Sequence, residues 1–371
     1  MGFTMKTYLV GGAVRDKLLG RAIKERDYVV VGSSAAEMLK LGFKKVGRAF
    51  PVFLHPKTHE EYALARTERK VACGYRGFIC YAEPMVTLEE DLGRRDLTIN
   101  AMAEDATTGE LIDPHRGAQD LRKKILRHVS PAFAEDPVRI LRIARLAARM
   151  GDFKVAQATN RLMVQMVKNG EIDALVPERV WQEWVRALGE NHPYQFFATL
   201  ANCGALEKLF YPIAKHLTPI KKTLEAMTPS DTDSATRLAA IAANLDRAEM
   251  DSLSKCYKLP SSYRDLALLT IKLKNSLSSS PAGHDAVITL LEQSDAYRRP
   301  QRFKQALRAC QIYTLALRIS PQRIFHNLLR AHKLTKDVCL TKSQLEKNSG
   351  AQLKELLHKK RVDRLDTLLS P

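Results

Sequence analysis

The chain has 371 residues, of which 45% are hydrophobic and 27% are charged, and its net charge at pH 7 is +18. This length predicts several folded domains, and the composition is typical of a globular protein rather than of a disordered one. No apolar run approaches the ~20 residues that cross a bilayer, and the start of the chain lacks a signal-peptide segment. Six scattered cysteines without a Cys-x-x-Cys pair favour free thiols, so we expect a cytoplasmic protein.

Short strands and helices alternate in the first third of the chain. Helices are predicted at 13–19 and 34–41, and strands at 7–10, 28–31, 44–47, 52–54, 61–65 and 111–113. This part predicts a small α/β head over residues 1–130.

After Pro131 the apolar residues follow a helical period. Helices are predicted at 138–149, 157–169, 177–188, 194–202 and 235–245, and the helical pattern continues to 369 with breaks at Pro260, Pro281, Pro300 and Pro321. We expect no strand here. The fold class is therefore α+β, an α/β head followed by an all-α neck (131–200), body (201–290) and tail (291–371).

A glycine pair lies in the run LVGGAVRD at residues 9–16. Gly11 and Gly12 end the first predicted strand and open a helix. Glycine lets backbone N–H groups approach a phosphate closely, and a helix N-terminus favours an anion. Arg15 follows within reach of the same phosphate.

Two carboxylates lie in the run ERDYVVV at residues 25–31. Alternation along a strand sends Glu25 and Asp27 to one face and Arg26 to the other. Because neighbouring carboxylates repel each other, a divalent metal that holds nucleotide phosphates is their natural partner.

Two further motifs are RRDLTINA at 94–101 and EDPVRILRIAR at 135–145. In this order, the four motifs resemble those of bacterial-type (class II) tRNA nucleotidyltransferases, the CCA-adding enzymes related to polymerase beta. The resemblance is almost unbroken over 8–148 and weaker at 177–181, 203–206 and 297–302. It implies addition of C, C and A to the 3′ end of tRNA from CTP and ATP.

The resemblance also implies a metal site. Glu25 and Asp27 match the pair that holds two Mg²⁺ ions, with Mn²⁺ as an alternative, although the family has Asp at both positions. Glu61, in the run HEEYALAR at 59–66, matches a third carboxylate that aligns the attacking 3′-hydroxyl, and Glu60 faces the opposite way. Residues 66–77 resemble the flexible loop that switches the family from C to A addition.

For the incoming nucleotide, the resemblance implies that Arg95 holds phosphate and that Asp96 accepts a hydrogen bond from the ribose 2′-hydroxyl. Asp136 and Arg139 would read the base. The carboxylate accepts from the exocyclic amine of C or A, and the guanidinium donates to cytosine O2/N3 or adenine N1. Alternatively, Asp136 caps the helix that starts at Pro137.

Three arginines repeat along that helix. Arg139, Arg142 and Arg145 fall on one face at i, i+3 and i+6. Because like charges repel, a triphosphate or RNA partner explains this face better than a solvated surface does.

A long basic stretch lies near the C-terminus. Residues 296–336 contain ten Lys or Arg and no Asp or Glu, which favours a polyanion partner. Few aromatic residues interrupt it, so phosphate contact fits better than base stacking. By the resemblance, Arg298, Arg299 and Arg302 would bind the tRNA acceptor arm.

Some relatives carry a phosphohydrolase domain with a His-Asp metal site. The one His-Asp pair here is His284-Asp285, with no histidine cluster near it in sequence, so we expect no such activity. The sequence leaves open a bacterial poly(A) polymerase, an enzyme that adds only CC or only A, and a tRNA-binding homologue weakened through Glu25.

Overall fold

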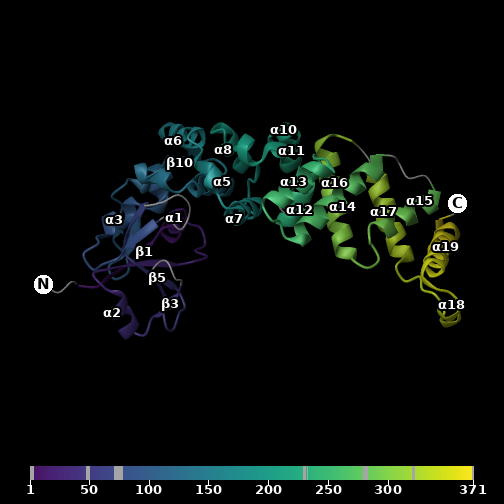
Figure 1. Ribbon diagram of the computed structural model, residues 1–371, viewed down its shortest axis with the longest axis horizontal. Helices are drawn as coiled ribbons and strands as arrows, with labels where there is room; N and C mark the ends of the chain where they lie inside the picture. The colour runs from purple at the N-terminus through teal and green to yellow at the C-terminus, as the bar shows by residue number, and fades with distance from the viewer. Residues whose placement is uncertain are drawn as a thin grey trace. The chain divides into compact units, whose positions relative to one another are not determined.

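The computed structural model describes residues 4–46, 51–70, 78–228, 231, 233–278, 283–319 and 322–369. The chain forms two compact units (Figure 1). The first comprises Met1–Ala187 and Gln195–Lys208, and the second comprises Leu188–Tyr194 and Leu209–Pro371. Strands followed by helices confirm the predicted α+β class. The finer division into head, neck, body and tail stays a prediction.

A seven-stranded sheet forms the base of the first unit, in the order β3-β4-β5-β2-β1-β8-β9. Only β2 and β5 run parallel among its neighbouring strands. All six predicted strands are present, and the unpredicted β8 is short. The strands are β1 Lys6–Val10, β2 Asp27–Val31, β3 Lys44–Val46, β4 Val52–Leu54, β5 Glu61–Leu64, β8 Ala103–Asp105 and β9 Leu111–Ile112. Residue 47, expected at the end of β3, lies outside the described residues.

Both faces of this sheet are covered, because successive side chains of a strand point to opposite sides. Val29 packs on one face with Leu88 and Leu92 of α3 (Leu88–Gly93). Val30 packs on the other face with Met38 of α2 (Ala35–Lys40). Since Asp27 alternates with Val29, it lies on the α3 side of the sheet.

Seven further α-helices belong to the first unit, and five of them lie at predicted positions, whereas the two short helices at 117–122 and 205–209 were not predicted. They are α1 Gly12–Leu18, α4 Gly117–Arg122, α5 Val138–Met150, α6 Gln157–Lys168, α7 Pro177–Leu188, α8 Tyr194–Asn202 and α9 Ala205–Leu209. Ten of the thirteen residues of α5 are buried, so α5 is the central helix after the sheet.

Two small strand pairs correct the sequence predictions. β11 (Lys154–Val155) pairs with β10 (Ile125–Leu126), so the expectation of no strand after Pro131 is wrong. β6 (Thr67–Lys70) pairs with β7 (Phe78–Tyr81), so the expected flexible loop begins as a strand. Residues 71–77 lie outside the described residues. These four strands form two-stranded sheets of their own, outside the seven-stranded sheet.

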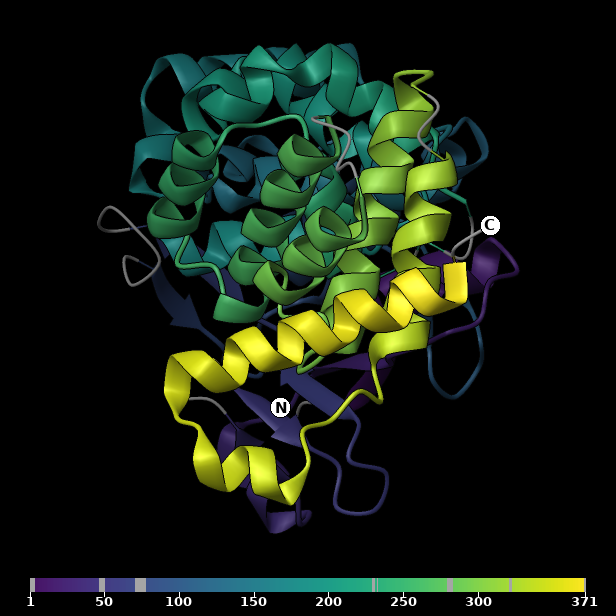
Figure 2. The same ribbon diagram turned by 90° about the vertical axis from the view of Figure 1, so that its right-hand side faces the viewer.

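The second unit is helical throughout its described residues. Its helices are α10 Tyr211–Lys215, α11 Leu217–Glu225, α12 Ser234–Ala242, α13 Arg247–Cys256, α14 Ser261–Ser278, α15 Gly283–Gln293, α16 Pro300–Ala316, α17 Gln322–Thr335, α18 Lys342–Lys347 and α19 Gly350–Leu369. α12, α14 and α16 pack together, and α19 crosses in front of earlier helices and contacts α15 and α17 (Figure 2). Within the described ranges, no helix is both long and apolar enough to cross a bilayer.

Candidate active site

Three carboxylates gather at the N-terminal ends of two inner strands of the sheet, β2 and β5. β2 and β5 pair in parallel with Asp27 directly opposite Glu61, and alternation places both side chains on the α3 face. Glu25 lies two residues before Asp27. Local desolvation, followed by the charges of Glu61 and Glu25, raises the pKa of Asp27, whereas the charge of Arg95 lowers it.

These carboxylates are a fitting donor set for a cation. Within the described residues, none of Glu25, Asp27 and Glu61 forms an ion pair, whereas Glu60 lies 3.6 Å from Arg26. Among the described residues, no three His, Cys, Asp or Glu side chains lie close enough together to hold a metal ion by themselves. Mg²⁺ is commonly held by one or two carboxylates together with substrate phosphates and water, which agrees with such an open site.

The glycine turn brings a guanidinium close to these carboxylates. Gly11 has φ +71°, a conformation that favours glycine, and a Cβ there would lie 3.1 Å from Nη1 of Arg95. Arg95 donates to Asp91 through Nε and Nη2, which leaves Nη1 directed at the turn. A phosphate at the N-terminus of α1 would therefore meet both backbone N–H groups and the Arg95 cation.

Arg15 lies on the inner side of the same turn. Its side chain is only 3% exposed and bonds to Asp16 and Asn100, with its Nη2 3.4 Å from the Cβ position of Gly12. A contact between Arg15 and a triphosphate at this turn stays a prediction. Spacing in the sequence gave its proximity to Gly12, but not the side on which it lies.

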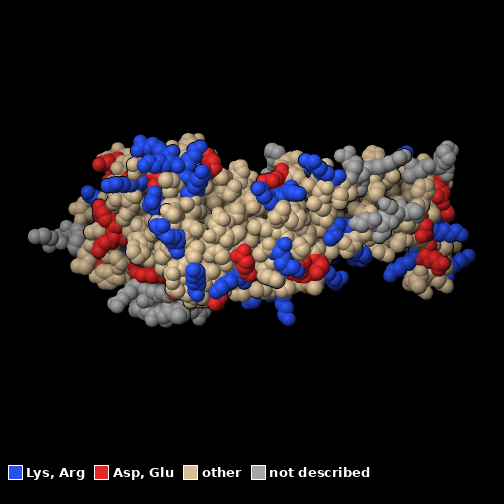
Figure 3. All heavy atoms as spheres, turned by 90° about the horizontal axis from the view of Figure 1, so that it is seen from above, with Lys and Arg blue, Asp and Glu red and all other residues tan. Residues whose placement is uncertain are grey.

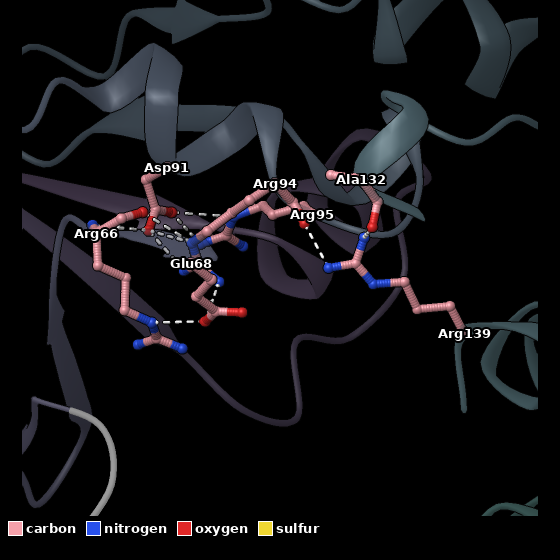
Figure 4. A network of polar contacts seen from close by, with 7 residues as sticks. All are labelled: Arg66, Glu68, Asp91, Arg94, Arg95, Ala132 and Arg139. Carbon is pink, nitrogen blue, oxygen red and sulfur yellow. Dashed lines mark hydrogen bonds and ion pairs between the residues drawn. The ribbon is translucent and has the colours of Figure 1, made fainter. Parts of the chain in front are cut away.

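Asp91 is the centre of the arginine network, and the sequence reasoning missed it (Figure 4). Its carboxylate is fully buried and accepts from both Arg94 and Arg95, at 2.6 and 3.0 Å. Arg94 also donates to Glu68 and to the carbonyl of Arg66, which ties the start of β6 to this centre. The i,i+3 and i,i+4 spacing of Asp91 to the two arginines was a signal that could have identified it.

Asp96 is buried and bonded on several sides. It accepts from the Leu97 amide at 2.8 Å, from Asn100 at 3.1 Å and from Nε of Arg142 at 2.7 Å. Burial alone would raise the pKa of Asp96, but Arg142, Asn100 and Arg139 outweigh it and hold the pKa well below its usual range. Asp96 is thus an ionised acceptor at neutral pH.

Asp136 and Arg139 lie at the start of α5. Asp136 accepts from the Val138 amide at 3.1 Å, as the capping alternative predicted, and also from Nη2 of Arg179 at 2.9 Å. Arg139 donates to the carbonyls of Ala132 and Arg94, at 3.0 and 2.7 Å (Figure 4). The Arg179 contact could not be expected from the sequence, because α7 begins about forty residues later.

The remaining arginines of α5 have acidic partners. Arg142 lies 2.7 Å from Asp96, and Arg145 lies 2.5 Å from Glu183 of α7. Acids from distant segments thus balance the charge of Arg142 and Arg145, and the expected triphosphate or RNA partner of this face stays a prediction. Any role of Arg142 and Arg145 toward a nucleotide remains a prediction.

The basic stretch of the second unit also has a counter-charge. Asp295, one residue before the acid-free window, lies 3.7, 3.5 and 3.4 Å from Arg298, Arg299 and Arg302. Arg308 pairs with Asp231 at 2.7 Å. The basic stretch, which has no acid of its own in the sequence, is therefore faced by acids from just before it and from a distant segment. On the visible face of the molecule, Lys and Arg lie among Asp and Glu (Figure 3).

A histidine does lie beside the His-Asp pair. His358 of α19 is 2.9 Å from both Asp285 and Glu292, and His284 is 2.6 Å from Asp366. The sequence has no histidine cluster near His284-Asp285, and the fold brings one histidine from a distant segment, His358, to Asp285. These contacts are hydrogen-bonded pairs, and no described group of three such residues forms a metal site.

A carboxylate pair on parallel strands beside a glycine turn defines a nucleotidyltransferase head. Residues 7–127 match a family model described as the Poly A polymerase head domain, and residues 152–217 match one described as a probable RNA and SrmB-binding site of polymerase A. The predicted enzyme class is confirmed. The chain belongs to the family of CCA-adding enzymes, as the relatives below show.

Similar proteins are alike over nearly the whole chain. The CCA-adding enzyme of Coxiella burnetii (strain RSA 493 / Nine Mile phase I) is 46% identical over 99% of this chain and 96% of its own length. The Multifunctional CCA protein of Thioalkalivibrio sulfidiphilus is 51% identical over 83% of this chain and 84% of its own.

Solved structures have the same fold. The Bacillus stearothermophilus CCA-adding enzyme in complex with CTP has a TM-score of 0.70 at 25% identity and covers 98% of this chain and 88% of its own. The Thermotoga maritima CCA-adding enzyme complexed with tRNA has a TM-score of 0.66 at 25% identity, with the same coverage.

Proposed function

We propose that this chain adds C, C and A in turn to the 3′ end of tRNA from CTP and ATP, releasing pyrophosphate, in the cytoplasm. The observation that carries the proposal is the parallel register that sets Asp27 beside Glu61, next to the Gly11–Arg95 contact. The other functions that the sequence left open have less support. Relatives that match nearly the full chain are named for CCA addition, and the glycine turn and carboxylates are all present, which argues against a binding-only homologue.

Asp27 and Glu25 are the residues that would hold Mg²⁺, at two positions, with Mn²⁺ as an alternative. When bound, such cations neutralise the charge of the triphosphate. Arg95 and the backbone of Gly11 and Gly12 would hold the phosphates for in-line attack by the RNA 3′-hydroxyl. Glu61, opposite Asp27, would align that hydroxyl and accept its proton.

Ribose and base would be read by buried acceptors. Asp96 is ionised and held by Arg142, so it can accept from a 2′-hydroxyl that deoxyribonucleotides lack. Asp136, held by Arg179, would accept from the exocyclic amine of C or A. Arg139 would donate to the same bases, exchanging one of its backbone carbonyl partners for the base.

A single incorporation assay tests this function. The full chain is given a tRNA that ends before CCA, together with labelled CTP, ATP or both, in Mg²⁺ or Mn²⁺. We expect two C and one A to be added. Runs of A alone would indicate a poly(A) polymerase, and CC alone or A alone a partial enzyme. Tight tRNA binding without incorporation in either metal would refute the proposal.

Base selection can be separated from helix capping at Asp136. Asp136→Ser keeps an acceptor for the Val138 amide but removes the charged acceptor for an amine. We expect discrimination against G and U to fall by about 1–3 kcal/mol while total incorporation falls less. Competition between CTP and UTP measures this. If selectivity stays at the parent level, capping is the role of Asp136.

The basic residues before and within α16 can be tested in both directions. Replacing Arg298, Arg299 and Arg302 with alanine should weaken tRNA binding and lower its log–log salt slope by about one unit per lost phosphate contact. Asp295→Asn should do the opposite, because it removes the carboxylate that faces all three.

Asn also suits the φ of 56° at position 295, so the fold should be kept. Filter binding over a salt series measures both variants. Unchanged slopes for both would mean that these residues only cover a solvated surface.

A further inference from the structure

An unbroken chain of polar contacts connects the glycine turn to α5. Nη2 of Arg149 donates to Asp16 at 2.7 Å, and Nε of Arg15 donates to the same carboxylate at 3.0 Å. Nη1 of Arg15 then donates to Oδ1 of Asn100 at 2.5 Å, and Nδ2 of Asn100 donates to Asp96 at 3.1 Å. Arg142 closes the chain on the second oxygen of Asp96. We call these six residues the Asn100 chain.

The centre of the Asn100 chain is sealed from water. Arg15, Asp16, Asp96 and Asn100 are 3%, 5%, 6% and 8% exposed. Both ends return to the same helix, because Arg142 and Arg149 are two turns apart on α5. Buried polar groups in such a closed arrangement have few alternative partners, so their positions are mutually fixed.

Asn100 is the one neutral member, and its chemistry cannot be replaced simply. Its amide accepts from a cation and donates to an anion at the same time. A carboxylate at this position would repel Asp96, and an apolar side chain would leave both neighbours without a partner. The nearby charges also dictate which way the amide points.

We propose that Asn100 is a positioning residue for the incoming nucleotide, a role that rests on the proposed function of this site. It holds Arg15 next to Gly12, in the glycine turn where the phosphates would bind. It also holds the Asp96 carboxylate that would accept a hydrogen bond from the ribose. Through Arg142 the same chain fixes α5, whose first turn follows Asp136. One amide thus sets three elements that would contact phosphate, sugar and base.

The test is Asn100→Asp, which keeps the volume and the acceptor for Arg15 but loses the donor to Asp96. KM and kcat for CTP and ATP, and the preference for CTP over 2′-deoxy-CTP, are compared with the parent. We expect KM to rise about tenfold and the ribose preference to fall about five- to tenfold, with a smaller change in kcat. Asn169→Asp, the same change at an exposed position of the first unit, is the control and should match the parent.

A second variant keeps the proposal testable if Asn100→Asp does not fold. Arg149→Gln weakens the far end of the Asn100 chain, where the guanidinium is partly exposed, and should shift KM and ribose preference in the same direction by less. Equilibrium binding of CTP and ATP is measured beside the kinetics. A parent that incorporates neither nucleotide overturns the proposed function. A working parent with variants of unchanged KM and ribose preference overturns only the positioning role.

Discussion

Asp27→Ala should reduce incorporation of CTP and ATP about a thousandfold or more, while tRNA binding stays close to that of the parent. The reason is its place directly opposite Glu61, without any ion pair among the described residues, where burial and the neighbouring carboxylates raise its pKa and favour a cation as partner. A bound divalent cation contributes several kcal/mol to the stabilisation of charge during phosphoryl transfer, and ~1.4 kcal/mol corresponds to a factor of ten.

The measurement is the incorporation rate on tRNA without CCA, with filter binding of the same tRNA. Glu60→Ala is the matched control, because Glu60 is adjacent to Glu61, faces away from Asp27 and pairs with Arg26. It should keep activity near the parent level. If Asp27→Ala keeps activity within a few-fold of the parent, the assignment of a metal site to Asp27 is wrong.

Asp91→Asn should lower the free energy of unfolding of the first unit by about 3 kcal/mol. The change leaves Arg94 and Arg95 beside a neutral amide at a fully buried position, and breaking a buried ion pair from one side is strongly destabilising. Denaturant unfolding of the full chain measures the difference. Asp152→Asn is the control, because its pair with Lys124 is exposed, and it should change stability very little.

Because Asp91 is ionisable, we expect the stability of the fold to depend on pH. Burial alone would raise the pKa of Asp91, but Arg94 and Arg95 outweigh it and lower the pKa. A depressed pKa means that the stabilisation is present above the ordinary carboxyl pKa of about 4 and is lost as the pH falls through the lower folded value. The parent should therefore lose stability in acid more steeply than Asp91→Asn. Parallel acid profiles would contradict this assignment.

Local pattern explains which parts of the fold were predictable. The strands of the sheet and the helices from α5 onward have apolar periods that follow from burial, so their positions could be predicted. β8, β10 and β11 were not predicted, although β3, β4 and β9 are equally short and were predicted. β8, β10 and β11 are defined by the strands with which they pair.

The same distinction between neighbours in the sequence and partners from distant segments applies to the candidate site. The glycine pair and the carboxylates are set by neighbours in the sequence, and the structure brings Asp27 and Glu61 together as expected. Asn100 and Arg179 contact partners that are distant in the sequence, Arg15 and Asp136, so the sequence did not reveal these contacts. Asp91 was missed although its two arginines are only three and four residues away. Arg142 and Arg145 were interpreted as part of a face for a triphosphate or RNA, because their partners Asp96 and Glu183 lie far away in the sequence.

Because one pair of parallel strands holds Asp27 opposite Glu61, the effect of an insertion on the site depends on where in the chain it falls. Thirty-three residues separate Asp27 from Glu61, and most of them form α2, β3, β4 and turns outside the β2–β5 ladder. Insertions there leave the ladder intact. One residue inserted within β2 or β5 would instead turn a carboxylate to the opposite face, where the Tyr28 and Tyr62 rings stack 4.5 Å apart. We therefore expect changes of length to be better tolerated in the loops of the crossover than within the two strands that it joins.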